Sequence, residues 1–165
     1  EEQWRQIMAE RSTGRLIKAD SAGLPVTVER FDEFDGSNWV YNIQLEIAAV
    51  LPVVISEINT ACKAAIEGGF VSNALGQDYS YDSELEDQVN ISGNVQMGSD
   101  VYHKRIDANG DADYVIHTTA QMRQVGEDLV AHKLTQLTKA ALLKGQAKAA
   151  AEANDLAALQ AITWS

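Results

Sequence analysis

Acidic and amide side chains recur at every second position in one short stretch, the pattern in this chain that comes closest to a cation site. The residues are Asp107, Asn109, Asp111 and Asp113. Calcium loops of the EF-hand type place oxygen ligands at their first, third, fifth and seventh positions. Here the sixth position is Ala112 rather than glycine, and the twelfth is Thr118 rather than a bidentate glutamate. We therefore expect a solvated acidic turn without metal, with a bound cation as the alternative.

The three histidines, His103, His117 and His132, do not have the spacing of a zinc motif. His117 directly precedes a predicted helix, where its ring could hydrogen-bond a carboxylate such as Asp87. His132 is expected to pack between helices. The sequence has neither a phosphate-binding loop nor a nucleophile elbow. It therefore predicts a protein that is not an enzyme, with no catalytic residues, cofactor or metal.

Another group of polar residues lies at the starts of two predicted helices. Its members are Asp87, Gln88 and Asn90 on the first helix and His117, Thr118 and Gln121 at the second. A hairpin between the helices returns the chain on itself, so the two groups can meet. A fully satisfied buried network fixes one packing, and we expect such a cluster to join the helices. A ligand pocket built from the same residues is the alternative.

The N-terminal part of the chain predicts a small β-structure. We expect a short helix over 1–11, strands over 14–19 and 25–30, and a polar connection over 32–37. An isolated hairpin is marginally stable, so this one must pack on something else. We expect residues 1–41 to form a β-hairpin arm and residues 42–165 the main domain. Because the first residue is Glu1, we also expect translation to start upstream.

Apolar residues at intervals of three and four predict a helix from Asn42 to Glu67. Pro52 should kink this helix or mark its true start, and Gly68-Gly69 should end it. Cys62, the only cysteine, is expected to be a small buried side chain. The longest apolar cluster, Ile47–Ile55, is too short to span a membrane, so no insertion is expected.

Two more hairpins and a helix are predicted downstream. The hairpins pair 70–74 with 79–82 and 101–106 with 112–116. The second hairpin turns around Asp107–Asp111, in which Asn109-Gly110 is a hairpin signal. Between them, Ser83 should cap a helix with Glu86 as its capping-box partner. That helix should carry Leu85, Val89 and Val95 and end near Gly93 or Gly98.

The longest predicted helix begins after Thr118, with Gln121 completing a capping box, and runs to about Ala149. Spacings of four, three and four residues predict a heptad seam along it, made of Val130, Leu134, Leu137 and Ala141. A helix of this length exceeds what a compact domain covers, so we expect the seam to contact another subunit. Asp155 should start a last turn that returns Leu156, Leu159, Ile162 and Trp164 to the body.

Composition is that of one globular domain with an arm, and the fold class predicted is α+β. It should have small antiparallel β-hairpins and two to four helices, with the long helix C-terminal. Thirteen Lys and Arg against 24 Asp and Glu give a net charge of −11. Such a charge repels nucleic acid, so no nucleic-acid partner is expected.

Several stretches together resemble a domain of unknown function of tailed bacteriophages and prophages. They are Gly68–Gly76, Tyr81–Asn90, Gly93, His117–Gly126, Lys133 and Leu159–Trp164, within residues 60 to 164. Genes for that domain usually lie beside those for tail fibres and tail-fibre assembly proteins. The resemblance implies a virion structural protein of the phage tail, in the tail fibre or tail tip, that is made in the host cytoplasm.

The resemblance also implies other phage tail proteins as partners and a homo-oligomer, with a trimer favoured. A non-virion chaperone for tail-fibre assembly is the alternative, and an unrelated enzyme or ligand-binding module is a third possibility. No chemistry is implied. The matching positions Asp87, Gln88, Asn90, His117, Thr118, Gln121 and Lys133 are expected to be scaffold or interface residues.

Overall fold

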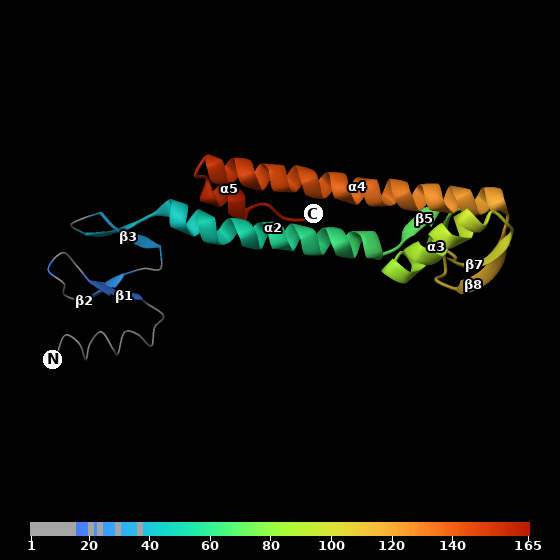
Figure 1. Cartoon of the computed structure of the whole chain (residues 1–165), viewed down its shortest axis with the longest axis horizontal. Coiled ribbons are helices and arrows are strands. Elements are labelled where there is room, and N and C mark those ends of the chain that lie inside the picture. Colours follow the sequence, from blue (N-terminus) through green and yellow to red (C-terminus); the bar gives the residue numbers. More distant parts are fainter. Residues whose placement is uncertain (1–15, 20–21, 23–24, 29–30, 36–37) are drawn as a thin grey trace. The chain divides into compact units, whose positions relative to one another are not determined.

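The computed structural model describes residues 16–19, 22, 25–28, 31–35 and 38–165 (Figure 1). The helix predicted over residues 1–11 lies outside these ranges. The chain divides into two units: Glu1–Val54 with Gln146–Ile162, and Ile55–Gly145 with Thr163–Ser165. Two long helices contribute residues to both units, and each unit is described separately below.

The chain has an α+β fold, as predicted from the sequence. Its described helices are α2 (Ile43–Glu67), α3 (Leu85–Met97), α4 (Thr119–Glu152) and α5 (Leu156–Gln160). The described strands form two 2-stranded sheets and one 4-stranded sheet, all antiparallel. The predicted long C-terminal helix is α4, with 34 residues.

Two hairpins open the first unit. β1 (Leu16–Ala19) pairs with β2 (Pro25–Val28), which confirms the predicted first hairpin. β3 (Asp32–Phe34) pairs with β4 (Trp39–Tyr41), so the expected polar connection over 32–37 is wrong. The Asp35 carboxylate accepts the Asn38 N–H at 2.8 Å and closes the turn. Backbone pairing and turn chemistry override the polar composition, which a two-stranded ribbon tolerates.

The helical part of the first unit has a small core. Its buried side chains include Ile47 and Val54 of α2, Ala147 of α4 and Leu159 of α5. Asp155 caps α5 as predicted, because its carboxylate accepts the Ala158 N–H at 2.9 Å. Helix α2 begins at Ile43 and runs through Pro52, so the alternative start at the proline is wrong. Pro52 is exposed, where water can bond the carbonyl that lacks an N–H partner.

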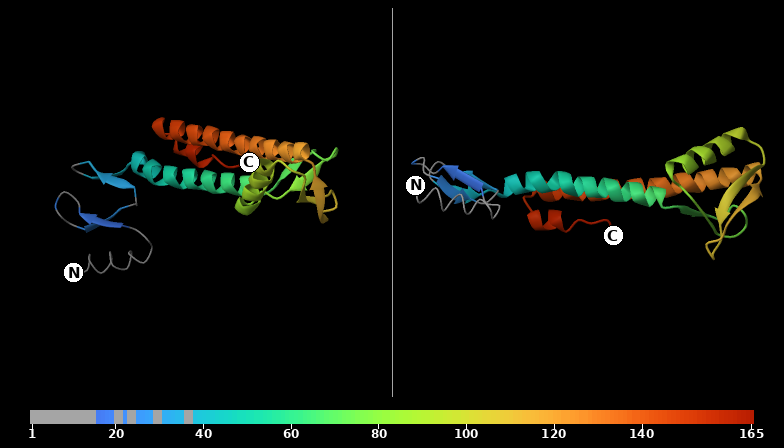
Figure 2. Two further views of the ribbon diagram at one scale, coloured as in Figure 1. Left: turned by 45° about the vertical axis from the view of Figure 1, so that its right-hand side comes forward. Right: turned by 90° about the horizontal axis from the view of Figure 1, so that it is seen from below.

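The second unit packs its sheet against α3 and α4 (Figure 2). The sheet order is β5 (Phe70–Ser72), β6 (Tyr79–Tyr81), β7 (Val101–Ile106) and β8 (Ala112–His117). Its buried core consists of Phe70, Tyr81, Ile91, Met122, Val125 and Leu129. The two predicted hairpins are confirmed, although strand ends differ by one or two residues.

The turn between β7 and β8 has the five residues 107–111 that the sequence predicts, although the Asn109-Gly110 pair within it is typical of a two-residue turn. The last pair of the hairpin is Ile106 with Ala112. The Asp107 carboxylate accepts the N–H groups of Asn109 and Asp111 at 2.8 and 3.0 Å. This side chain therefore organises a wider loop in which Gly110 takes a φ of 88°.

The cap of α3 lies one residue later than predicted. Glu84 is the N-cap, and Asp87 completes the capping box instead of Glu86. Ser83 is unavailable because its hydroxyl donates to the Ile66 carbonyl at 2.6 Å and accepts the Gly69 N–H at 2.9 Å. It thereby joins the end of α2 to the start of α3. Helix α3 ends at Gly98, which has a φ of 64°.

The apolar side chains of α3 divide between the core and the surface. Leu85 and Val89 are 70% and 64% exposed, whereas Ile91 is buried and Val95 packs against the core. A Cβ at Gly126 of α4 would lie 2.9 Å from Cγ2 of Val95. The absence of a side chain at Gly126 therefore lets α3 approach α4 on its Ile91–Val95 side, which leaves Leu85 and Val89 outside.

Within the second unit, α2 and α4 are joined by two side-chain contacts to backbone carbonyls. The His132 ring bonds the Ala65 carbonyl at 2.9 Å, and the Cys62 thiol lies 3.6 Å from the Gln136 carbonyl. Cys62 is 6% exposed, which confirms the expected buried thiol. His132 packs between helices as predicted.

Helix α2 is long and apolar enough to cross a membrane, judged by length and composition alone. An 18-residue window has a mean hydropathy of 1.6, and 22% of that window is buried. The apolar segment is thus longer than the Ile47–Ile55 cluster indicated. A core helix of a soluble protein passes the same test, so the absence of membrane insertion stays a prediction.

Candidate interaction surface on helices α3 and α4

Helix α4 begins with the capping box that the sequence predicts. The Thr118 N–H donates to Gln121 Oε1 at 2.9 Å, and the Gln121 N–H donates to Thr118 Oγ1 at 3.3 Å. These reciprocal bonds satisfy two backbone donors and fix where the helix starts. The positions of all later side chains around α4 follow from that start.

The predicted seam of α4 lies on the surface. Val130, Leu134 and Leu137 are 56%, 58% and 50% exposed, and Ala141 is exposed as well. We call these four residues the apolar row. The core of the second unit uses a different side of the helix, through Met122, Val125 and Leu129. The described chain therefore leaves an apolar face of α4 uncovered.

A groove between α3 and α4 borders the apolar row. Its volume is about 550 Å³, and Val130 forms part of its wall. The other lining residues include Gln88, Ser92 and Gln96 of α3 and Gly126 of α4. Leu85 and Val89 share one side of α3 with Ser92 and Gln96, because the spacings are close to whole helical turns. Exposed apolar side chains thus stand on both helices that form the groove.

Gln88 and Lys133 hold the two helices together at this groove. Lys133 Nζ donates to Gln88 Oε1 at 2.6 Å, and Gln88 Nε2 donates to the Ser83 carbonyl at 2.8 Å. Both amide ends of Gln88 are therefore used. This pair links α3 to α4 through Lys133, which was not a member of the expected cluster.

The rest of the expected polar cluster does not form one network. Asp87 serves the α3 cap, and Gln121 serves the α4 cap. Asn90 lies exposed on α3. His117 bonds neither Asp87 nor Gln121. The cause is the sheet, because β8 places His117 in the core while the two capping residues remain at helix ends.

His117 is fully buried and bonded to neutral partners. Its Nε2 lies 2.9 Å from the Tyr81 hydroxyl, and its Nδ1 lies 3.0 Å from the Val115 carbonyl. The His103 ring stands edge-on to it, with centroids 5.7 Å apart. Burial lowers the pKa of both histidines and raises the pKa of Tyr81 to about 12. These groups are suited to packing as neutral rings rather than to proton transfer with solvent.

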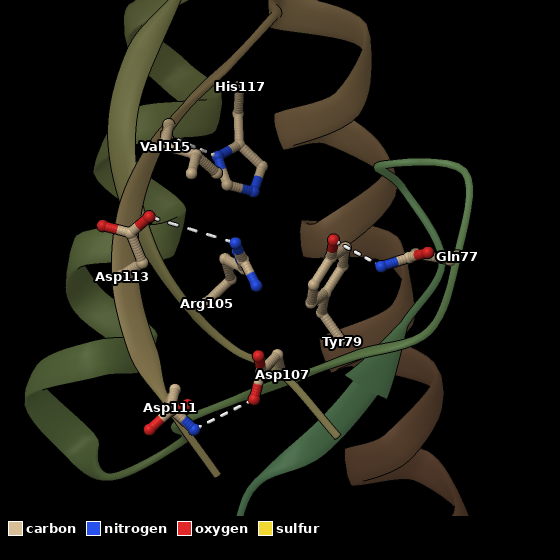
Figure 3. A network of polar contacts seen from close by, with 8 residues as sticks. All are labelled: Gln77, Tyr79, Arg105, Asp107, Asp111, Asp113, Val115 and His117. Carbon is tan, nitrogen blue, oxygen red and sulfur yellow. Dashed lines mark hydrogen bonds and ion pairs between the residues drawn. The ribbon is translucent and has the colours of Figure 1, made fainter. Parts of the chain in front are cut away.

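The acidic turn makes polar contacts around Arg105 (Figure 3). Arg105 lies over the Tyr79 ring, 4.3 Å from its centroid, and its guanidinium is 3.9 Å from the Asp113 carboxylate. The N–H groups of Asp111 and Asn109 lower the pKa of Asp107. Two of the four candidate ligands thus have other roles, and among the described residues no metal-binding group of His, Cys, Asp or Glu occurs. That the turn binds no metal stays a prediction.

A second groove lies farther along the apolar row, between α2 and α4. Its volume is about 430 Å³. It is lined by Leu137, Ala141 and Lys144 of α4 and, on α2, by Cys62 and Ile66 among others. The apolar row is therefore bordered by one groove near Val130 and by another near Ala141. Neither groove was predicted from the sequence, although Gly126 inside a helix was a signal of close packing.

A family model matches residues 51–163, which is most of the chain. It is described as a domain of unknown function, DUF4376. The chain belongs to this family. The apolar row, both grooves and the four-stranded sheet all lie within the DUF4376 domain. No curated protein and no solved structure matches the chain.

Proposed function

We propose that this DUF4376 protein is a structural component of a bacteriophage tail, in the tail fibre or tail tip, and that it acts through contacts with other proteins. The observation that carries the proposal is the uncovered apolar row of α4. Its three large members are each at least half exposed. Contiguous apolar surface of this kind marks protein-binding sites.

The phage context of the proposal comes from the sequence. The stretches over 68–76, 81–90 and 117–126 resemble a domain that accompanies tail-fibre genes. The contacts of the polar residues support a binding role over an enzymatic one, because His117, Gln121 and Asp87 have structural partners. In this proposal the protein is made in the host cytoplasm, ends in the virion and has no cofactor.

Mass spectrometry of purified phage particles tests the proposal. We expect the protein in the particles at a fixed ratio to the other tail proteins. A chaperone for tail-fibre assembly would use the same apolar surface, but it would be present in infected cells and absent from particles. That second result would replace the structural role with the chaperone role.

A variant of the apolar row tests whether that surface carries the contact. Leu134→Asp with Leu137→Asp should prevent incorporation into particles, because a carboxylate is costly to bury at an apolar contact. Leu142→Asp is the matched control. Leu142 is 62% exposed on the same helix, about 100° around the axis from Ala141. Equal incorporation of both variants would contradict the proposal.

A further inference from the structure

We infer that the apolar row of α4 pairs with the same row of a second copy, with the two helices antiparallel. A two-fold axis would pass between Leu134 and Leu137. This inference deepens the proposed function, because it names one partner for the surface on which that function rests. It depends on the residues that continue the row at its two ends.

The row ends in opposite charges. Continuing the spacing of three residues leads from Val130 back to Glu127 and from Ala141 on to Lys144. Among the described residues, neither charge belongs to an ion pair within the chain. Glu127 is exposed and Lys144 is half-buried beside the groove of α2. Both side chains are therefore available to a partner.

Antiparallel pairing gives every residue of the row a complementary residue on the partner. In this register Leu134 meets the partner's Leu137, Val130 meets the partner's Ala141, and Glu127 meets the partner's Lys144. The two-fold axis repeats each of these contacts, because such an interface uses the same patch on both copies. Two opposite-charge contacts then flank the apolar centre.

Parallel pairing is disfavoured by the charges of Glu127 and Lys144. It would place Glu127 beside Glu127 and Lys144 beside Lys144, and like charges across a helical seam disfavour that arrangement. A parallel trimer would bring three copies of each charge together. The charge pattern therefore favours a two-fold pair over the trimer that the resemblance implies.

Sedimentation equilibrium of charge-reversal variants tests the orientation. Wild type should form a dimer at micromolar concentration. Glu127→Lys and Lys144→Glu should each weaken it about tenfold, because each single change creates two like-charge contacts. The double reversal should restore the wild-type dissociation constant, and so should an equal mixture of the two single variants.

A second pair of variants separates loss of contact from loss of folding. Leu134→Asp should abolish the dimer, whereas Leu142→Asp should leave it unchanged. Both positions are exposed, so circular dichroism should show the same helix content in each variant. A wild-type monomer at micromolar concentration, a trimer, or single reversals without effect would each overturn the antiparallel pair. None of these results would remove the protein from phage particles, so the proposed function is tested separately.

Discussion

The Ser83 hydroxyl is fully buried between two backbone groups. It donates to the carbonyl of Ile66, at the end of α2, and accepts the N–H of Gly69, at the start of β5. A buried polar group that loses its partner costs free energy because it cannot return to water. One side chain therefore fixes the exit of α2 relative to the entry of α3.

Ser83→Ala should lower the free energy of unfolding by about 1–3 kcal/mol, because it leaves both backbone groups without this partner. Urea denaturation measures the loss. Ser80→Ala is the control, since Ser80 is an exposed residue of β6. Equal stability of the two variants would show that water replaces the hydroxyl.

The paired histidines predict a stability that depends on pH. Burial lowers the pKa of His103 and of His117 below the ordinary value of 6.5. For His103 the neighbouring His117 lowers the pKa further, and Asp87 opposes the shift. Below pH 6.5 the unfolded chain therefore binds more protons than the folded chain.

We expect the free energy of unfolding to be greatest above about pH 6.5 and to decrease as the pH drops through that value. Urea denaturation at a series of pH values measures this dependence. His103→Asn should have a shallower dependence over the same range. An unchanged slope in that variant, or greater stability at acidic pH, would contradict the assignment.

At the scale of elements, two glycines of α4 form a natural comparison. A Cβ at Gly126 would lie 2.9 Å from Val95 of α3, whereas a Cβ at Gly145 would meet nothing within 4 Å. Alanine is a better helix former than glycine at either position. Any difference between the two substitutions therefore reports the contact between α3 and α4.

Gly126→Ala should lower the melting temperature, because overpacking costs about 1–3 kcal/mol and exceeds the gain in helix propensity. Gly145→Ala should raise it slightly. Combining Gly126→Ala with Val95→Ala should recover part of the loss, since the smaller side chain removes the clash. A stabilised Gly126→Ala variant would mean that α3 moves away at no cost. Calorimetry distinguishes these results.

The sequence predicted elements better than contacts. Periodic spacing and the Gly68-Gly69 stop located α2, and the Thr118–Gln121 box located the start of α4. The α3 cap was misplaced because Ser83 and Glu84 both precede the helix, and only the tertiary contact of Ser83 with Ile66 decides between them. The exposure of Leu85 and Val89 likewise depends on which side of α3 meets Gly126.

The same limit applied to the candidate surface. The apolar row was predicted from heptad spacing. The residues at its two ends can also be located from the helical spacing of α4 alone. The link between Gln88 and Lys133 joins residues 45 positions apart, so it depends on how α3 packs. The expected bond from His117 to a carboxylate such as Asp87 does not form, because its position at the end of β8 makes it a core residue.

At the scale of the whole molecule, the net charge opposes membrane insertion, whereas the composition of helix α2 favours it. The net charge of −11 repels anionic membranes, whereas α2 has the length and hydropathy of a membrane span. The bonds from Cys62 and His132 tie the end of α2 to α4. Insertion of α2 would break these contacts.

We therefore expect the purified protein to remain in the supernatant when sedimented with vesicles of zwitterionic or anionic lipid. The reason is that the contacts with α4 and the negative charge both oppose transfer of α2 into lipid. A variant with His132→Ala measures how much the contacts contribute. Cosedimentation of the wild type with zwitterionic vesicles would show that α2 leaves α4 for the bilayer.

The single thiol of the chain gives a means of timing how the protein opens. Cys62 is 6% exposed and faces the Gln136 carbonyl of the neighbouring helix. Because so little of Cys62 is exposed, a thiol reagent should react slowly with the folded chain and faster whenever α2 and α4 separate there. With no other cysteine to interfere, the alkylation rate of the unaltered protein reports how often that separation occurs, and a bound partner that holds the helices together would slow it.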